Sequence, residues 1–252
     1  MKALITGASS GIGSEIAKCL ADMGCDLILV ARRRDALETL ARSLGKKVSV
    51  RIISTDLSVR ENCFELYGKT SCENVDILVN NAGFGVFGNF AETDLDRELS
   101  LIDTNVTAVH ILTKLFLKDF VAADKGRILN VASSAAFTVG PLMSAYYASK
   151  SYVFRLSQGI SEELRRAGSR VSMSVLCPGP VDTEFNDVAG VRFGVPAMKS
   201  PDVARIAVDG LLNGKKVIVP GAAIKFGRIA GKLLPDGILA RVGYNIQKKK
   251  ER

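Results

Sequence analysis

A tyrosine and a lysine stand four residues apart, and a serine lies thirteen residues before the tyrosine. These residues are Tyr146, Lys150 and Ser133. The phenol is a proton donor, a nearby ammonium tunes its acidity, and the serine hydroxyl can orient a carbonyl oxygen. The i, i+4 spacing places Tyr146 and Lys150 on one helix face. The pattern therefore predicts a group that transfers a proton to or from a substrate oxygen.

A glycine-rich loop near the N-terminus supplies a second chemical feature. It reads Thr6-Gly7-Ala8-Ser9-Ser10-Gly11-Ile12-Gly13 and stands between a predicted strand and a predicted helix. Free N–H groups at a helix start and the helix dipole attract a pyrophosphate, and glycines let it approach the backbone. The spacing departs from the G-x-G-x-x-G dinucleotide fingerprint. We expect dinucleotide contacts from Gly7, Ser9, Ser10, Gly11, Ile12 and Gly13.

The residues after the second predicted strand bear on the choice of cofactor. Strand 27–31 is followed by Arg32, Arg33 and Arg34, where many dinucleotide folds have an acid for the ribose 2′-hydroxyl. A carboxylate would repel a 2′-phosphate, whereas a guanidinium can hydrogen-bond it. We therefore expect NADP(H) to be preferred over NAD(H), with Arg32 as the first contact, Arg33 as the second and Arg34 in solvent.

Short apolar runs alternate with longer helical patterns along the chain. Predicted strands cover residues 3–6, 27–31, 48–54, 77–80, 127–131, 171–176 and 217–219. Predicted helices cover residues 12–23, 35–44, 60–69, 95–122, 145–167 and 201–212. Strands that are apolar almost throughout are typical of a parallel sheet covered on both faces. The alternation predicts an α/β protein with a doubly wound sheet, and residues 1–252 as one domain.

Two regions interrupt this alternation. Residues 177–200 contain three of the seven prolines and several glycines, and a connection of this length is typical of a substrate lid. Residues 221–252 mix apolar and basic residues, and we interpret them as a basic C-terminal extension, irregular or amphipathic. We expect its end, Lys248 to Arg252, to be a solvated tail. Contact of residues 224–246 with anionic lipid is the alternative.

The whole-chain composition limits the function classes. The 252 residues carry a net charge of +8, which favours anionic partners such as a nucleotide or an acyl carrier; we expect no nucleic-acid partner. No apolar stretch approaches the roughly 20 residues of a membrane-spanning helix, and no signal peptide is evident, so we expect a cytosolic protein. Five cysteines without C-x-x-C spacing and one histidine predict reduced thiols and no metal site.

With these residues in view, the chain resembles the short-chain dehydrogenase/reductase family from Lys2 to about Leu212. Within that family it is similar to NADPH-dependent carbonyl reductases. The resemblance rests on the glycine loop, the serine, the Tyr-x-x-x-Lys pair and further segments, namely Asp56-Leu57, Asn80-Asn81-Ala82-Gly83, Asn105 and Pro178-Gly179-Pro180-Val181-x-Thr183. It implies a seven-stranded parallel Rossmann sheet, and homodimers or homotetramers assembled through two long helices.

The resemblance also implies roles for individual residues. Asp56 and Asn81 would flank the adenine side, Thr183 would meet the nicotinamide carboxamide, and Asn105 would support a proton-relay water. Lys150 would also hold the nicotinamide ribose. Further cofactor contacts are implied for Leu57, Ala82, Gly83, Pro178, Gly179 and Val181. Tyr146 would protonate the alkoxide that forms as a carbonyl accepts hydride, and we expect the ammonium and an oxidised nicotinamide to lower its pKa. Tyr147 is then a packing or pocket-wall residue.

Apolar residues in loops after strands four to six suggest the substrate class. These candidates are Phe84, Phe87, Phe137, Leu142, Met143, Phe185 and Phe193. They favour a small ketone, aldehyde or acyl chain over a sugar. Three functions remain open: a broad carbonyl reductase, a reductase of 3-oxoacyl thioesters on a carrier or coenzyme A, and a dinucleotide-binding scaffold without turnover.

Overall fold

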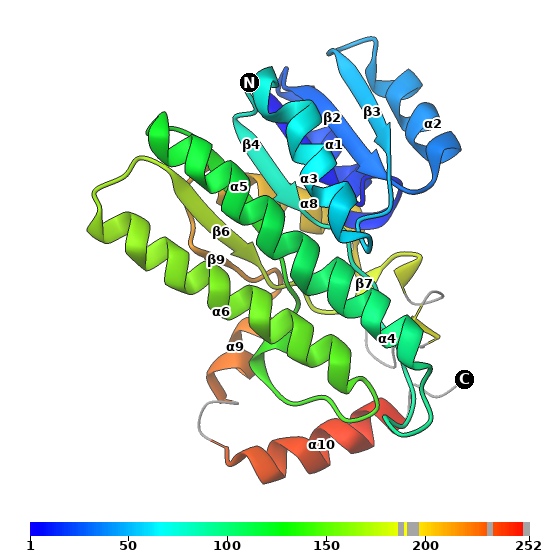
Figure 1. Ribbon diagram of the computed structural model, residues 1–252. Coiled ribbons are helices and arrows are strands. Elements are labelled where there is room, and N and C mark those ends of the chain that lie inside the picture. Colours follow the sequence, from blue (N-terminus) through cyan, green and yellow to red (C-terminus); the bar gives the residue numbers. More distant parts are fainter. Residues whose placement is uncertain (186–188, 191–196, 231–233, 249–252) are drawn as a thin grey trace.

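A seven-stranded parallel sheet forms the centre of the protein (Figure 1). The computed structural model describes residues 1–185, 189–190, 197–230 and 234–248. The strand order is β3-β2-β1-β4-β5-β6-β9, so the direction of winding reverses between β1 and β4. The strands are β1 (Lys2–Thr6), β2 (Asp26–Ala31), β3 (Val50–Ser54), β4 (Ile77–Asn80), β5 (Arg127–Val131), β6 (Ser172–Leu176) and β9 (Val217–Ile218). The expected doubly wound α/β fold is confirmed.

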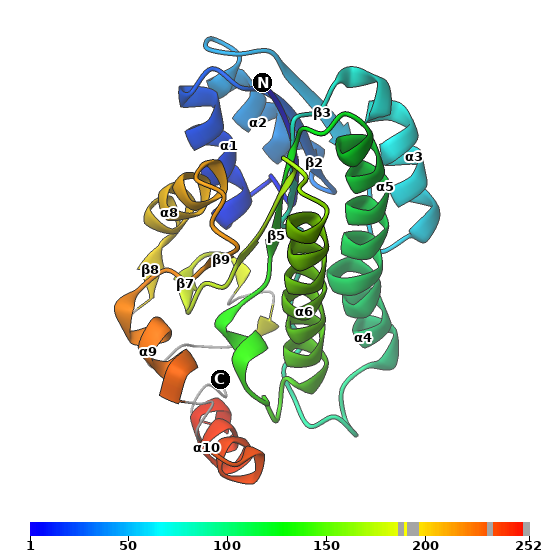
Figure 2. The same ribbon diagram turned by 90° about the vertical axis from the view of Figure 1, so that its left-hand side faces the viewer.

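Helices cover both faces of this sheet (Figure 2). One layer contains α1 (Gly11–Asp22), α2 (Arg34–Leu44) and α8 (Ser200–Leu212). The other contains α3 (Arg60–Thr70), α4 (Leu95–Ile102), α5 (Val109–Ala122) and α6 (Ser144–Arg166). Alternate strand residues point into the two layers: Ile5 and Leu29 join the core with α1, whereas Leu4 and Ile28 join the core with α5. Burial on both faces explains why these strands are apolar throughout.

The element boundaries agree with the sequence predictions to within two residues for strands and main helices, with one difference. The helix expected over residues 95–122 is interrupted between α4 and α5 by a π-helical segment, η2 (Asp103–Ala108). Such widened turns occur where a helix must present a side chain at a functional site. Asn105 lies in this segment. The chain also contains two short 3₁₀ turns, η1 (Ser71–Glu73) and η3 (Ser134–Phe137).

The segment expected to be a lid contains regular structure at its ends. Strands β7 (Val181–Asp182) and β8 (Met198–Lys199) pair in parallel as a small second sheet. The centre of the segment, residues 186–188 and 191–196, lies outside the described residues, and Phe193 lies there.

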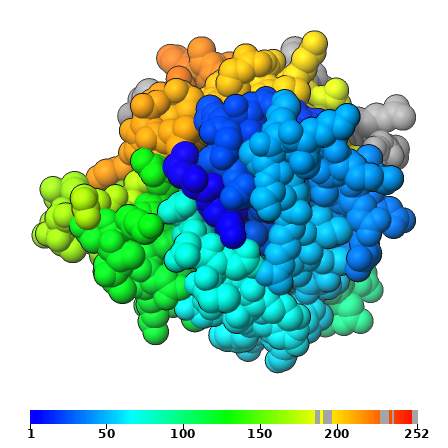
Figure 3. Space-filling model, turned by 90° about the horizontal axis from the view of Figure 1, so that it is seen from above, coloured from blue at the N-terminus to red at the C-terminus, as the bar shows by residue number. Residues whose placement is uncertain are grey.

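The basic C-terminal segment forms two helices, α9 (Ala222–Ala230) and α10 (Asp236–Lys248). In Figures 1 and 2 both helices lie beyond the end of the sheet at which β1 to β6 finish, and α10 is the outermost. Figure 3 views the opposite end, where atoms of the blue N-terminal part of the chain reach the surface. Among the described helices, none combines the length and apolar character that crossing a membrane requires.

Polar side chains within the core join the sheet to the layer of α5 and α6. Asn80 Nδ2 donates to Asn130 Oδ1 at 2.9 Å and to Thr113 Oγ1 at 3.0 Å. Asn130 Nδ2 donates in turn to Ser157 Oγ at 3.0 Å. All four residues are at most 2% exposed, so each hydrogen bond replaces contacts with water that burial has removed.

Replacement of Asn130 by leucine should destabilise the protein by about 2–4 kcal/mol, because the buried Asn80 amide and Ser157 hydroxyl each lose one hydrogen-bond partner. Urea unfolding measures the change. The same substitution at exposed Asn245 on α10 is the control and should change the unfolding free energy by less than about 0.5 kcal/mol. Equal effects of both substitutions would contradict the assigned importance of the buried network.

Candidate active site

A pocket of about 430 Å³ opens at the carboxyl ends of the parallel strands. Loops that follow β1, β2, β3, β4, β5 and β6 all contribute to its lining. In open α/β sheets this is the edge at which ligands bind, next to the reversal in strand order. The pocket is lined by every residue expected to contact a dinucleotide except Gly13. Asn105, which was expected among the catalytic residues, is also outside the lining.

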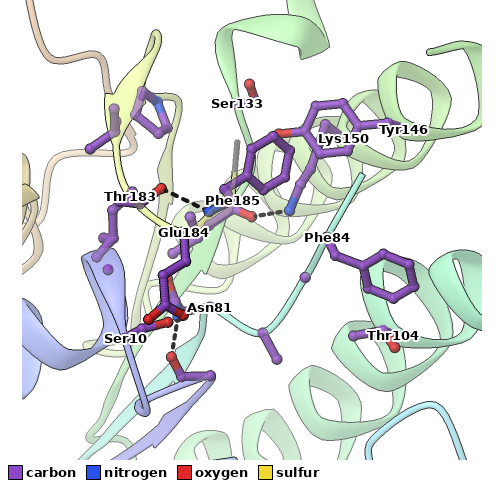
Figure 4. A pocket seen from close by; sticks show the side chains of 18 of the residues that line it. Ser10, Asn81, Phe84, Thr104, Ser133, Tyr146, Lys150, Thr183, Glu184 and Phe185 are labelled. Atoms are coloured by element: carbon purple, nitrogen blue, oxygen red, sulfur yellow. Dashed lines mark hydrogen bonds between the residues drawn. The ribbon is translucent and has the colours of Figure 1, made fainter. Parts of the chain in front are cut away.

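Ser133, Tyr146 and Lys150 gather at one side of this pocket (Figure 4). Tyr146 and Lys150 project from α6, and Ser133 follows β5. The Lys150 ammonium lies 5.8 Å from the centroid of the Tyr146 ring and donates a hydrogen bond to the Val131 carbonyl at 3.0 Å. The Ser133 oxygen accepts from the Ala135 N–H at 3.1 Å.

Burial dominates the protonation of both ionisable groups in this trio. It raises the pKa of Tyr146 to about 12, while a hydrogen bond with Ser133 acts in the opposite direction. It lowers the pKa of Lys150 to about 8, because the charged ammonium has lost its hydration. The sequence predicts that the ammonium and an oxidised nicotinamide together lower the pKa of Tyr146. Among the protein's own groups, burial has the largest effect and raises this pKa, whereas the effect of an oxidised nicotinamide stays a prediction.

Asn105 is fully buried and its amide is committed to protein groups. Its Oδ1 accepts from the Phe84 N–H at 3.1 Å, and its Nδ2 donates to the Phe84 carbonyl at 3.0 Å and to Ser149 Oγ at 3.1 Å. The side chain thus fastens the loop after β4 to helix α6. Support of a water molecule by Asn105 stays a prediction.

The glycine loop packs closely against the loop after β4. Gly7 has φ = 64°, and a Cβ there would lie 2.8 Å from the Ala82 Cα. A Cβ at Gly13 would lie 2.4 Å from the Gly7 carbonyl oxygen and from Asn81 Nδ2, so both positions exclude larger residues. Asn81 Nδ2 also donates to the Thr6 and Gly7 carbonyls at 3.0 and 3.1 Å. The cradle expected for a pyrophosphate is therefore built and fits a dinucleotide.

The three arginines after β2 have different surroundings. Arg32 and Arg33 line the pocket, whereas Arg34 pairs with Glu38 along α2. Arg32 is 65% exposed and its Nη1 lies 3.9 Å from Asp56 Oδ2. The other Asp56 oxygen accepts from the N–H and hydroxyl of Ser58, at 2.9 and 2.8 Å. Asp56 thus shapes its own loop and also faces the first arginine.

Sequence reasoning missed Glu184, which closes the pocket rim. Its carboxylate accepts from Arg33 Nη2 at 2.7 Å, and the same nitrogen donates to Ser9 Oγ at 3.3 Å. Figure 4 places Glu184 between Thr183 and Ser10. The partners are 151 residues apart, so no local pattern signals the contact.

The apolar end of the pocket includes only part of the predicted set. Phe84, Met143 and Phe185 line it, and the Phe185 and Tyr146 ring centroids are 5.2 Å apart. Phe137 instead packs against Phe154 in the core, with centroids 5.3 Å apart. Phe87 and Leu142 also lie outside the lining.

A second residue that the sequence did not reveal is Gln247 on α10. It is 1% exposed, and its Nε2 donates to the Tyr147 hydroxyl at 2.5 Å. Tyr147 lines the pocket beside Tyr146, with ring centroids 6.1 Å apart. The wall of the pocket is therefore joined to the C-terminal helix. Within the described residues, no cluster of three or more potential metal ligands occurs.

The fold and the pocket define a doubly wound Rossmann protein with a serine, a tyrosine and a lysine in the same pocket as the glycine loop. The family model described as short chain dehydrogenase matches residues 1–190. The chain therefore belongs to the short-chain dehydrogenase family and is an oxidoreductase of that family.

Relatives agree with this assignment and differ in their cofactor. An uncharacterized oxidoreductase of Staphylococcus saprophyticus is 31% identical, over 88% of this chain and 96% of its own. A Sphingobium yanoikuyae short-chain dehydrogenase in complex with NADPH is 31% identical, with a TM-score of 0.84 over 92% of this chain and 93% of its own. A Burkholderia phymatum short chain dehydrogenase/reductase in complex with NAD is 26% identical, with a TM-score of 0.83 over 90% and 91%.

The buried ammonium of Lys150 should make stability depend on pH. Its pKa of about 8 lies below the 10.5 of a free lysine, so between these values the unfolded chain binds a proton that the folded protein has lost. The unfolding free energy must therefore rise with pH over this window. From pH 7 to 9.5 the contribution is about 2 kcal/mol.

The substitution Lys150→Met removes this contribution, so its stability relative to the wild type should fall by that amount between pH 7 and 9.5. Urea unfolding at both pH values measures it. Exposed Lys18 provides the matched control, since Lys18→Met should show a difference from wild type that is independent of pH. A pH-independent difference for Lys150→Met as well would contradict the lowered pKa.

Proposed function

We propose that this protein is an NADPH-dependent reductase of carbonyl groups on apolar small molecules. One observation carries the proposal: the hydroxyls of Ser133 and Tyr146 and the ammonium of Lys150 line the same pocket as the glycine cradle. A proton donor, a hydrogen-bond donor and a cation are thereby available beside the place where a nicotinamide would lie. This set suits addition of hydride to a carbonyl followed by protonation of its oxygen.

Each side chain has a defined part in this reaction. A bound NADPH supplies the hydride for the carbonyl carbon. Ser133 donates a hydrogen bond to the carbonyl oxygen, and Tyr146 gives that oxygen its proton as negative charge develops. A phenol kept protonated by burial is ready to act as the acid in the reductive direction. Lys150 stabilises the phenolate that remains and holds the nicotinamide ribose, and Thr183 contacts the carboxamide. Asn105, held by Phe84 and Ser149, supports the water that returns a proton.

Replacement of Tyr146 by phenylalanine should lower kcat by about 100-fold or more, because the acid is lost, and should leave the Kd for NADPH within about two-fold. Steady-state assays and nicotinamide fluorescence measure the two quantities. Tyr147→Phe is the neighbouring control and should keep at least about a tenth of the wild-type kcat. Full turnover by the Tyr146 variant would remove the catalytic assignment.

The arginines on the rim support a preference for NADPH. No acid follows β2, and Arg32 and Arg33 face the pocket at the position that an adenosine 2′-phosphate would approach. Arg32 has the more open guanidinium, whereas Arg33 is shared between Ser9 and Glu184. Since a charge-assisted hydrogen bond contributes about 1.5–3 kcal/mol, Arg32 can account for a preference of about ten-fold or more.

Fluorescence titration with NADPH and NADH is the most direct test of the cofactor. The wild-type protein should bind NADPH the more tightly, and Arg32→Ala should weaken NADPH by about ten-fold while changing NADH by less than about three-fold. Arg34→Ala, which removes a guanidinium paired with Glu38 outside the pocket, should change neither. If the preference for NADPH survived in Arg32→Ala, the proposed contact of Arg32 with the 2′-phosphate would be wrong, and Arg33 would be the next candidate.

The lining by Phe84, Met143 and Phe185 favours a ketone, an aldehyde or an acyl chain as the substrate. A 3-oxoacyl thioester is the second candidate, favoured by the basic C-terminal segment near this end of the molecule. Comparison of kcat/KM for a 2-alkanone and a 3-oxoacyl thioester, with and without carrier, separates the two. Binding of NADPH without turnover of either compound would favour the dinucleotide-binding scaffold.

We also propose that each chain is a single domain, that the chains assemble into a homodimer or homotetramer, and that the protein is cytoplasmic. The exposed apolar side chains of α4, Leu95, Leu99 and Ile102, support self-association through the long helices. Mass photometry of the purified protein measures the number of chains in the particle.

A further inference from the structure

Most of the protein's surplus charge belongs to its C-terminal segment. Residues 221–252 contain eight lysines and arginines and two acids, a net charge of +6 out of the +8 of the whole chain. On the described part of this segment, Lys225, Arg241 and Lys248 are exposed. Part of this charge therefore stands on the described exposed residues of α9 and α10, which lie beyond the end of the sheet (Figures 1 and 2).

The same two helices present large apolar side chains to solvent. Ile238, Val242 and Ile246 on α10 are 46%, 48% and 53% exposed. Their i, i+4, i+8 spacing places them in one stripe along the helix. Phe226 on α9 is 74% exposed, the highest value among the large apolar side chains described in this structure. We call Phe226, Ile238, Val242 and Ile246 the apolar stripe.

Contacts on the other side of α10 hold the stripe outward. Gln247 is buried against the Tyr147 hydroxyl. Gly243 packs so closely on the loop before α6 that a Cβ there would lie 3.1 Å from the Val139 carbonyl oxygen. Gly243 and Gln247 are one turn apart and lie on the side of α10 away from Ile238 and Val242. The helix is thus fastened by its inner side, and rotation that would bury the stripe is opposed.

The positive charge of residues 221–252 disfavours a second copy of the chain as the partner of the apolar stripe and favours an anionic surface. Two copies that met through this face would bring two segments of charge +6 together, which is electrostatically unfavourable. The exposed apolar residues of α4 differ, because the exposed acids Asp94 and Asp96 flank Leu95 there. A surface that combines exposed apolar side chains with exposed lysine and arginine is complementary to anionic headgroups over an acyl layer.

We propose that α9 and α10 dock the protein on anionic lipid surfaces, with the apolar stripe in the headgroup region and the basic side chains on lipid phosphates. In this contact the helices lie at the membrane surface and do not cross the bilayer. Because Gln247 joins α10 to Tyr147, the docked face lies at the end of the molecule where the pocket opens. An apolar substrate dissolved in the lipid would then be concentrated near the site.

Flotation of the full chain with vesicles tests this proposal. The probes are phosphatidylcholine vesicles and vesicles of phosphatidylcholine with about one third phosphatidylglycerol. The protein should partition at least about ten-fold more strongly onto the anionic vesicles, and 0.5 M NaCl should remove most of the binding, because exposed charges are screened. Failure to float with anionic vesicles, or equal recovery with both, would overturn the proposal.

Two matched double variants separate the stripe from other apolar surface. Ile238→Ser with Val242→Ser should reduce binding to anionic vesicles by at least about five-fold. The control, Val59→Ser with Phe64→Ser at the exposed start of α3, should leave it unchanged. NADPH affinity and thermal unfolding confirm that each variant is folded. Unchanged vesicle binding by the stripe variant would overturn the proposal. So would conversion of this variant to a smaller particle in mass photometry, since the stripe would then contact a second copy.

Discussion

The parallel direction of the central strands decides where the candidate functional groups lie. Because all seven strands run in one direction, the loops after β1 to β6 leave the sheet at the same edge. The glycine loop follows β1, the arginines follow β2 and Ser133 follows β5, so residues remote in sequence meet at one pocket. The register in turn depends on helices covering both faces, since strands apolar on both sides are stable only when neither face meets water.

The site retains groups that oppose stability. Lys150 is 5% exposed, and its ammonium donates a hydrogen bond to the Val131 carbonyl. A core optimised for stability would not place an ammonium there. Burial removes the hydration of this ammonium and thereby lowers the pKa of Lys150. The surrounding structure offsets this cost with committed polar contacts, including the Asn105 amide on Phe84 and Ser149 and the buried asparagines of β4 and β5. These buried polar contacts hold Ser133, Tyr146 and Lys150 in fixed positions.

Much of the architecture was predictable because its signals are local. Strand β4 and helix α6 follow from apolar runs and helical periodicity that need no knowledge of distant residues. The two-residue strands β7 and β8 were not predictable, since two residues carry no periodicity. Helices α9 and α10 were obscured by Gly227, Gly237 and Gly243 within their sequences. Such glycines lower helix propensity, and α10 gains stability instead from its contact with Tyr147.

The sequence by itself determined the chemistry on offer: the glycine loop, the Tyr146–Lys150 spacing, the upstream serine and the arginines that replace an acid after β2. Only the tertiary structure decided which groups act on one another. It paired Arg33 with Glu184 across 151 residues and Gln247 with Tyr147 across 100. It also buried the Tyr146 phenol, and this burial raises its pKa. The physical reason is that residue type and spacing are local properties, whereas burial and hydrogen-bond partners depend on which distant segments the fold brings together.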